Sequence, residues 1–70
     1  MKLSARNQLS GTVQHVELGA VMAEITVDVG GQRIVSAITR ASAERLGLTA
    51  GLPVTVFIKA TEVLLGVDEA

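Results

Sequence analysis

Three short segments of the chain carry side chains that could bind a small anion. Ser4–Gln8 combines a hydroxyl, a guanidinium and amide groups within five residues. Thr39–Ser42 places two hydroxyls at the expected start of a helix, where backbone amides and the helix dipole favour negative charge. Lys59–Thr61 adds an ammonium group and backbone donors where a strand is expected to end. Each segment alone is ordinary, but together they contain the donors that a buried dianion needs.

The charges in these segments indicate what kind of anion they would suit. Arg6 and Lys59 could balance two negative charges, which are otherwise costly to bury. The hydroxyls and backbone amides could then donate to four oxygen atoms. A nucleic acid is a poor candidate because the formal net charge is −1 and no basic stripe is present. The pattern therefore favours a compact oxyanion held by a few converging groups.

Residues for catalysis are scarce. The chain has one histidine, His15, and no cysteine, so no nucleophile and base pair is indicated by spacing. The glycines Gly30 and Gly31 fit a hairpin turn rather than a nucleotide-binding loop. We therefore expect no enzyme, no cofactor and no metal ion coordinated directly by the protein. His15 is expected on a strand surface or at an interface.

The elements that must position these groups are mainly strands. Val21–Val29 alternates apolar and polar residues, which predicts a half-buried strand, and Arg33–Ile38 is expected to return antiparallel to it. Gly11–Leu18 is rich in β-forming residues, but its alternation slips, which predicts a bulge or kink near Gly11. Gly19 marks the turn into the second strand.

The second half of the chain predicts one helix and two more strands. Thr39–Leu48 has helix formers, with Thr39 as a cap at the start and Gly47 at the end. Val54–Lys59 and Val63–Val67 then read as strands joined by residues 60–62. The order β-β-β-α-β-β predicts a mainly β domain over residues 1–70, an OB-like five-stranded barrel with one short helix.

Composition adds two expectations. The chain is 49% hydrophobic, with one aromatic residue, and 70 residues offer too little interior to bury that much aliphatic surface, so an obligate oligomer is expected. The single aromatic also disfavours single-stranded nucleic acids, which stack on aromatic rings. The N-terminus has no apolar signal-peptide core, and no apolar run is long enough to span a membrane, so a cytoplasmic protein is expected.

At this point the sequence resembles a known family, the molbindin (Mop) family with its TOBE domain. The resemblance runs from end to end with matching order and spacing. It implies a stand-alone, OB-like protein that forms a homo-hexamer, a trimer of dimers, and binds molybdate or tungstate between subunits for intracellular molybdenum storage or homeostasis. The residues that carry it are Ser4–Gln8, Leu9, Gly11, Gly19–Glu24, Ala37–Thr39, Ser42, Leu46–Leu48 and Ile58–Thr61.

The resemblance also implies site residues. The interface site falls on the side chains of Ser4, Arg6, Thr39, Ser42 and Lys59, with main-chain donors near Ala5 and Ala60. A second type of oxyanion site is placed on the turn formed by Gly19, Ala20 and Val21. The main alternative to molybdate binding is a TOBE-like assembly or regulatory module that acts through protein partners. A nucleic-acid-binding OB protein ranks below both.

Overall fold

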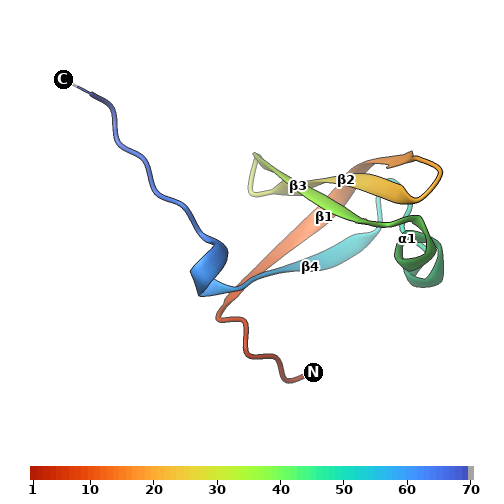
Figure 1. Cartoon of the computed structure of the whole chain (residues 1–70), viewed down its shortest axis with the longest axis horizontal. Helices are drawn as coiled ribbons and strands as arrows, with labels where there is room; N and C mark the ends of the chain where they lie inside the picture. Colours follow the sequence, from red (N-terminus) through yellow and green to blue (C-terminus); the bar gives the residue numbers. More distant parts are fainter. Residues whose placement is uncertain (70) are drawn as a thin grey trace.

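The computed structural model describes residues 1–69, so Ala70, the last residue of the expected domain, lies outside the described residues. Four antiparallel strands form one sheet in the order β3-β2-β1-β4, and a short helix packs at one end (Figure 1). None of the helices within residues 1–69 is long and apolar enough to cross a membrane. The elements are β1 (Asn7–Leu18), β2 (Met22–Val29), β3 (Gln32–Thr39), α1 (Arg40–Leu46), β4 (Pro53–Ile58) and the 3-10 helix η1 (Ala60–Glu62).

Strand β1 organises the sheet because it has a different neighbour in each half. Its first half, from Asn7 to Thr12, pairs with β4, and its second half, from Thr12 to Leu18, pairs with β2. Between the halves the register with β2 shifts, and Gln14 is left out of the pairing. The bulge that the slipped alternation predicts is therefore present, three positions beyond Gly11. It lets one strand serve two neighbours that lie in different directions.

Gly11 has a different role from the expected kink. A Cβ atom at this position would lie 2.7 Å from the Asp28 carbonyl oxygen and 2.7 Å from Val27 Cγ1. Real Cβ atoms do not come this close to a backbone oxygen. Gly11 is thus required because the end of β2, at Val27–Val29, lies too close to leave room for a side chain. A sequence pattern indicates this use of glycine only as a break in alternation.

The predicted hairpin and helix caps are confirmed. Gly30 and Gly31 have φ values of 56° and 86°, and Asp28 Oδ1 accepts a hydrogen bond from the Gly31 amide at 3.0 Å. Thr39 is the N-cap of α1, and Gly47 ends the helix with a φ of 64°. These glycines adopt the left-handed conformation that other residues avoid.

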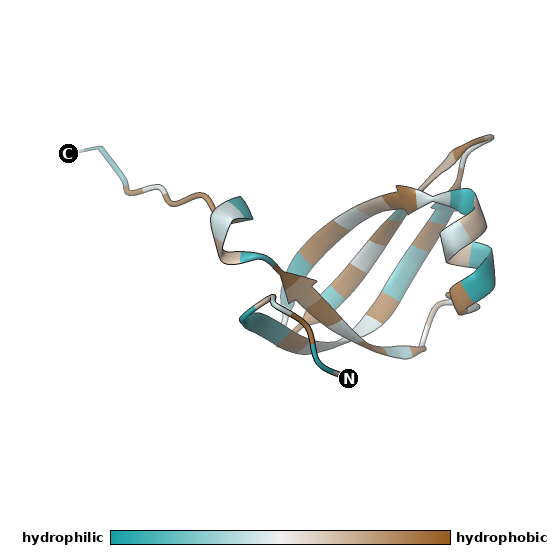
Figure 2. Ribbon diagram, turned by 60° about the horizontal axis from the view of Figure 1, so that its bottom comes forward, coloured by the Kyte–Doolittle hydropathy of each residue, from teal (hydrophilic) through white to brown (hydrophobic). Residues whose placement is uncertain are grey.

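The core lies on the concave face of the sheet and is small. Apolar and polar residues alternate along the strands (Figure 2). One copy leaves large aliphatic side chains exposed, as composition led us to expect. The fully buried side chains are Val13, Ala23, Ile25, Val27 and Ala43.

The predicted fifth strand is wrong for a single copy. Val63–Val67 forms no strand, and the expected connection at residues 60–62 is η1. After η1 the chain runs away from the sheet, which stays four-stranded and open rather than closing into a barrel (Figure 1). The alternation of Val63–Val67 correctly shows a segment able to form a strand. A strand also needs a neighbouring backbone to pair with, and η1 directs the segment away from its own sheet.

Candidate functional site

The N-terminal segment and the end of β4 meet at one end of the sheet. Asn7, the first residue of β1, pairs with Ile58, the last residue of β4. Arg6 immediately precedes this pair and Lys59 immediately follows it, so antiparallel pairing makes them neighbours. Asn7 Nδ2 also donates to the Ile58 carbonyl at 3.1 Å, which reinforces the junction. Two of the three predicted segments therefore converge, and they bring two positive charges together.

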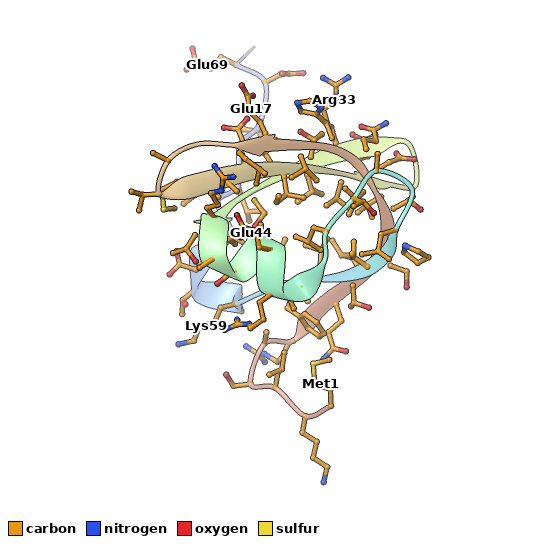
Figure 3. The ribbon with its side chains drawn as sticks, turned by 90° about the vertical axis from the view of Figure 1, so that its right-hand side faces the viewer. Met1, Glu17, Arg33, Glu44, Lys59 and Glu69 are labelled. Carbon is orange, nitrogen blue, oxygen red and sulfur yellow. The ribbon has the colours of Figure 1, made fainter. Side chains whose placement is uncertain are left out.

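The two cations are available to an external anion. Within residues 1–69 the one ion pair joins Arg40 and Glu44, so neither Arg6 nor Lys59 is neutralised by a carboxylate of that part of the chain. Both side chains are exposed, and Lys59 lies at the periphery of the molecule (Figure 3). Ser4 is exposed beside them, and Ala5 is half-buried. This end of the sheet is a cationic surface with hydroxyl and backbone donors next to it.

The backbone near Lys59 is held in shape by η1. The Lys59 carbonyl accepts from the Glu62 amide at 2.8 Å, and the Ala60 carbonyl accepts from the Val63 amide at 3.3 Å. These bonds occupy carbonyl oxygens and fix the direction of the chain at Ala60. Lys59 and Ala60 are both exposed, and the Lys59 side chain makes no capping hydrogen bond to η1.

Thr39 and Ser42 form a second hydroxyl pair at the start of α1. Thr39 Oγ1 accepts from the Ser42 amide at 3.1 Å and donates to Ser42 Oγ at 2.8 Å. The hydroxyl proton of Ser42 is then the one left for an outside acceptor. The expectation of free amides at this helix start needs correction, because the Arg40 amide donates to the Val21 carbonyl at 2.8 Å and the Ser42 amide to Thr39.

The turn Gly19–Val21, the predicted second site, is clamped to α1 by Arg40. Arg40 Nη1 donates to the Gly19 carbonyl at 3.3 Å, in addition to the bond from its amide to Val21. Arg40 Nε also contacts Glu44 Oε1 at 2.6 Å. Sequence reasoning assigned Arg40 no role, although its spacing of four from Glu44 on a helix favours such a pair. A shallow hollow here is lined by Ala20, Val21, Thr39, Arg40, Ala41 and Glu44.

One copy does not bring all the predicted site residues together. Arg6 and Lys59 lie where β1 begins, whereas Thr39 pairs with Met22 beside the end of β1. The 12 residues of β1 separate the two groups, and Figure 1 shows α1 at the opposite end of the sheet from η1. In addition, Arg40 beside the Thr39 group is already paired with Glu44, so this group brings no net positive charge to a dianion. Neither group alone contains the full donor set.

The other candidate chemistry is absent from the described chain. Among residues 1–69 no three His, Cys, Asp or Glu side chains lie close enough together to hold a metal ion. His15 is exposed on β1, as expected. The predicted site residues of this part of the chain are therefore cations, hydroxyls and backbone groups at the two ends of β1.

Comparison with known proteins finds a matching family and similar proteins over nearly the whole chain. The family model for the TOBE domain matches residues 3–65. A probable molybdenum-pterin-binding protein of Haemophilus influenzae is 42% identical over 69 residues, which cover 97% of this chain and 100% of the relative. The structure of a molybdate-binding protein from Sporomusa ovata has a TM-score of 0.89 and 45% identity, covering 93% of this chain and 97% of that chain. The molybdate-bound structure of the cytoplasmic molybdate-binding protein ModG has a TM-score of 0.91 and 46% identity, covering 97% of this chain and 49% of that chain.

Proposed function

Because the chain belongs to the TOBE domain family, we propose that it binds molybdate reversibly and catalyses no reaction. Proteins of similar sequence and structure over nearly the whole chain are named for binding molybdate or molybdenum-pterin. The observation that carries the proposal is the pairing of Asn7 with Ile58, which sets Arg6 beside Lys59. Molybdate is a tetrahedral dianion near neutral pH, so these two cations match its charge.

We place the site between two copies of the chain. The cationic end of one copy would face the hydroxyl pair of another, so that the anion receives charge from one subunit and hydroxyl donors from its neighbour. Burying the dianion requires both, because an unpaired charge or an unsatisfied oxygen is costly away from water. The proposed contacts are the side chains of Ser4, Arg6, Thr39, Ser42 and Lys59 and the backbone near Ala5 and Ala60.

A second type of site lies at the turn of Gly19, Ala20 and Val21. In one copy the carbonyls of Gly19 and Val21 already accept hydrogen bonds from Arg40. Arg40 and Ala20 line the hollow beside this turn. Several copies of this turn would have to meet around a symmetry axis to surround an anion. Within one copy Arg40 is already paired with Glu44 at this hollow, so the two side chains together offer no net positive charge to an anion.

The biological role follows from binding without chemistry. We propose a cytoplasmic homo-hexamer, a trimer of dimers built on five-stranded OB-like barrels, that stores or buffers molybdate or tungstate. The whole chain would act as one domain. A protein that only holds an anion needs many sites per assembly and a closed environment for each, and subunit interfaces provide both.

Calorimetric titration of the purified protein tests the proposal. Molybdate and tungstate should bind with measurable heat, and sulfate should bind more weakly. A folded protein that binds neither molybdate nor tungstate would contradict the proposal, and a role as an assembly module for protein partners would then be favoured.

A further inference from the structure

The start of α1 depends on contacts with the rest of the fold. The helix has 7 residues, and Ala43 is its buried side chain. A helix this short is not stable by itself, so tertiary contacts must fix its first turn. The position of that turn matters because Thr39 and Ser42, the hydroxyl pair of the proposed oxyanion site, lie there.

Arg40 makes three hydrogen bonds at this point. Its amide donates to the Val21 carbonyl at 2.8 Å, its Nη1 to the Gly19 carbonyl at 3.3 Å and its Nε to Glu44 Oε1 at 2.6 Å. The first two cross from α1 to the turn between β1 and β2, which lies close to the helix (Figure 1). The third stays within α1 and holds the guanidinium in the orientation that reaches Gly19.

Hydrogen bonds rather than core packing hold the turn between β1 and β2. The Gly19 amide donates to the Met22 carbonyl at 2.7 Å, which closes the turn. Ala20 and Val21 are both exposed, so neither side chain anchors the turn in the core. Within residues 1–69, Arg40 is the residue whose side chain donates to this turn. The relative position of the turn and α1 therefore depends on Arg40.

The pair of Arg40 and Glu44 contributes geometry rather than net charge. The two charges cancel, and the side chains are 45% and 58% exposed, so the pair should add little to the stability of the fold. A guanidinium is a planar group that can donate through Nε and Nη1 in two fixed directions at once, which an ammonium cannot do. Glu44, labelled on α1 in Figure 3, thus limits the orientations of the group that donates to Gly19.

We infer that Arg40 is a positioning residue for the proposed oxyanion site. Held by Glu44, it fixes the turn between β1 and β2 against the start of α1 and so keeps the hydroxyls of Thr39 and Ser42 in place for an anion. The inference rests on the proposed function, and it assigns neither Arg40 nor Glu44 a contact with the anion. Since donors at fixed separations discriminate between anions of different size, the pair should influence selectivity as well as affinity.

Glu44→Gln tests the inference, because charge and geometry predict changes of opposite sign. The substitution keeps the size of the side chain, removes a negative charge and leaves Arg40 unpaired. An effect of charge alone would therefore tighten molybdate binding. If the pair positions the hydroxyls, calorimetry at fixed salt should instead show binding weakened by about two- to fivefold, with a lower ratio of molybdate to sulfate affinity.

Arg40→Lys separates the shape of the guanidinium from its charge. It keeps the positive charge without the planar group, and it should weaken molybdate binding to the same extent as Glu44→Gln. The double variant should bind no more weakly than either single variant, because the two side chains act as one unit. Arg45→Gln is the matched control. It removes an exposed charge of α1 that makes no ion pair within residues 1–69, and it should change affinity by less than about twofold.

Hydrogen exchange gives a readout that needs no anion. The amides of Gly19 and Arg40 should exchange faster in Glu44→Gln than in the unmodified protein, whereas Arg45→Gln should leave them unchanged. Unchanged exchange of these amides would overturn the inference. Equal or tighter molybdate binding by Glu44→Gln, or unmodified affinity in Arg40→Lys, would also overturn it and leave the proposed function intact. Failure of the unmodified protein to bind molybdate would instead refute the proposed function.

Discussion

Removal of either cation at the beginning of β1 should weaken molybdate binding without unfolding the protein. Arg6 and Lys59 are exposed side chains that make no ion pair with residues 1–69, so Arg6→Ala and Lys59→Ala remove no contact that holds one copy together. What each variant loses is a charge-assisted contact to the anion. Such contacts contribute about 1.5–3 kcal/mol, or roughly a 10- to 160-fold change in the dissociation constant.

The size of the loss in molybdate affinity indicates how far the site is shielded from water. A cation that stays in contact with water is screened, and its interaction should fall at or below the lower end of this range. A cation covered by a second copy should lie near the upper end, since the attraction is stronger where water is excluded. Losses near 100-fold for both variants would therefore support a site between subunits.

Arg33→Ala is the matched control for charge. Arg33 is an exposed cation on β3 opposite Asp28, and Figure 3 shows it at the other margin of the molecule from Lys59. The screening length is about 8 Å at physiological salt, so loss of this distant charge should change affinity less than about twofold. Isothermal titration calorimetry at fixed salt measures all three variants, and thermal unfolding verifies that they fold. Equal weakening by Arg33→Ala and Arg6→Ala would refute the reasoning, as would wild-type affinity in both charge variants.

Three other outcomes are expected. Gly11→Ala should lower the free energy of unfolding in urea by about 1–3 kcal/mol, because its Cβ would meet the Asp28 carbonyl at 2.7 Å, whereas Gly66→Ala, with open space around it, should change it by less than about 0.5 kcal/mol. Thr39→Ala should cost about 1 kcal/mol in the same assay by removing the helix cap, and should also weaken molybdate binding in calorimetry, while Thr39→Ser should retain both. Competition titrations should rank molybdate and tungstate together and above sulfate, because a smaller anion leaves fixed donors unpaired at about 1–3 kcal/mol each; displacement of molybdate by sulfate at comparable concentration would contradict a rigid cavity.

Local signals in the sequence predicted local structure well. Thr39 and Gly47 fixed the ends of α1 because each satisfies backbone groups only a few residues away. The alternation of β2 and the glycines Gly30 and Gly31 likewise predicted a hairpin whose two strands are adjacent in the chain. In these cases the residues that determine the local structure lie within the same short segment.

The errors came from features that depend on distant or external partners. The pattern of Val63–Val67 shows that it can form a strand, but not which backbone it pairs with. Gly11 looked like a kink because the close approach of β2 leaves no mark in the neighbouring residues. The sequence indicated which kinds of donor the proposed site would use. It did not indicate that these residues lie at the two ends of β1, because that follows from the pairing register of the strands, which composition and spacing do not determine.

The pairing of Asn7 with Ile58 also has a consequence for how the protein is made. It joins positions 51 residues apart, and contacts of such long sequence separation form late in folding. The hairpins of β1, β2 and β3 can close first, while the beginning of β1 waits for β4, which is synthesised last of the strands. The pair of cations at Arg6 and Lys59 therefore does not form on a nascent chain until β4 has left the ribosome. Until then the edge of β1 that pairs with β4 is open. Chains made side by side on one messenger RNA could pair through this edge.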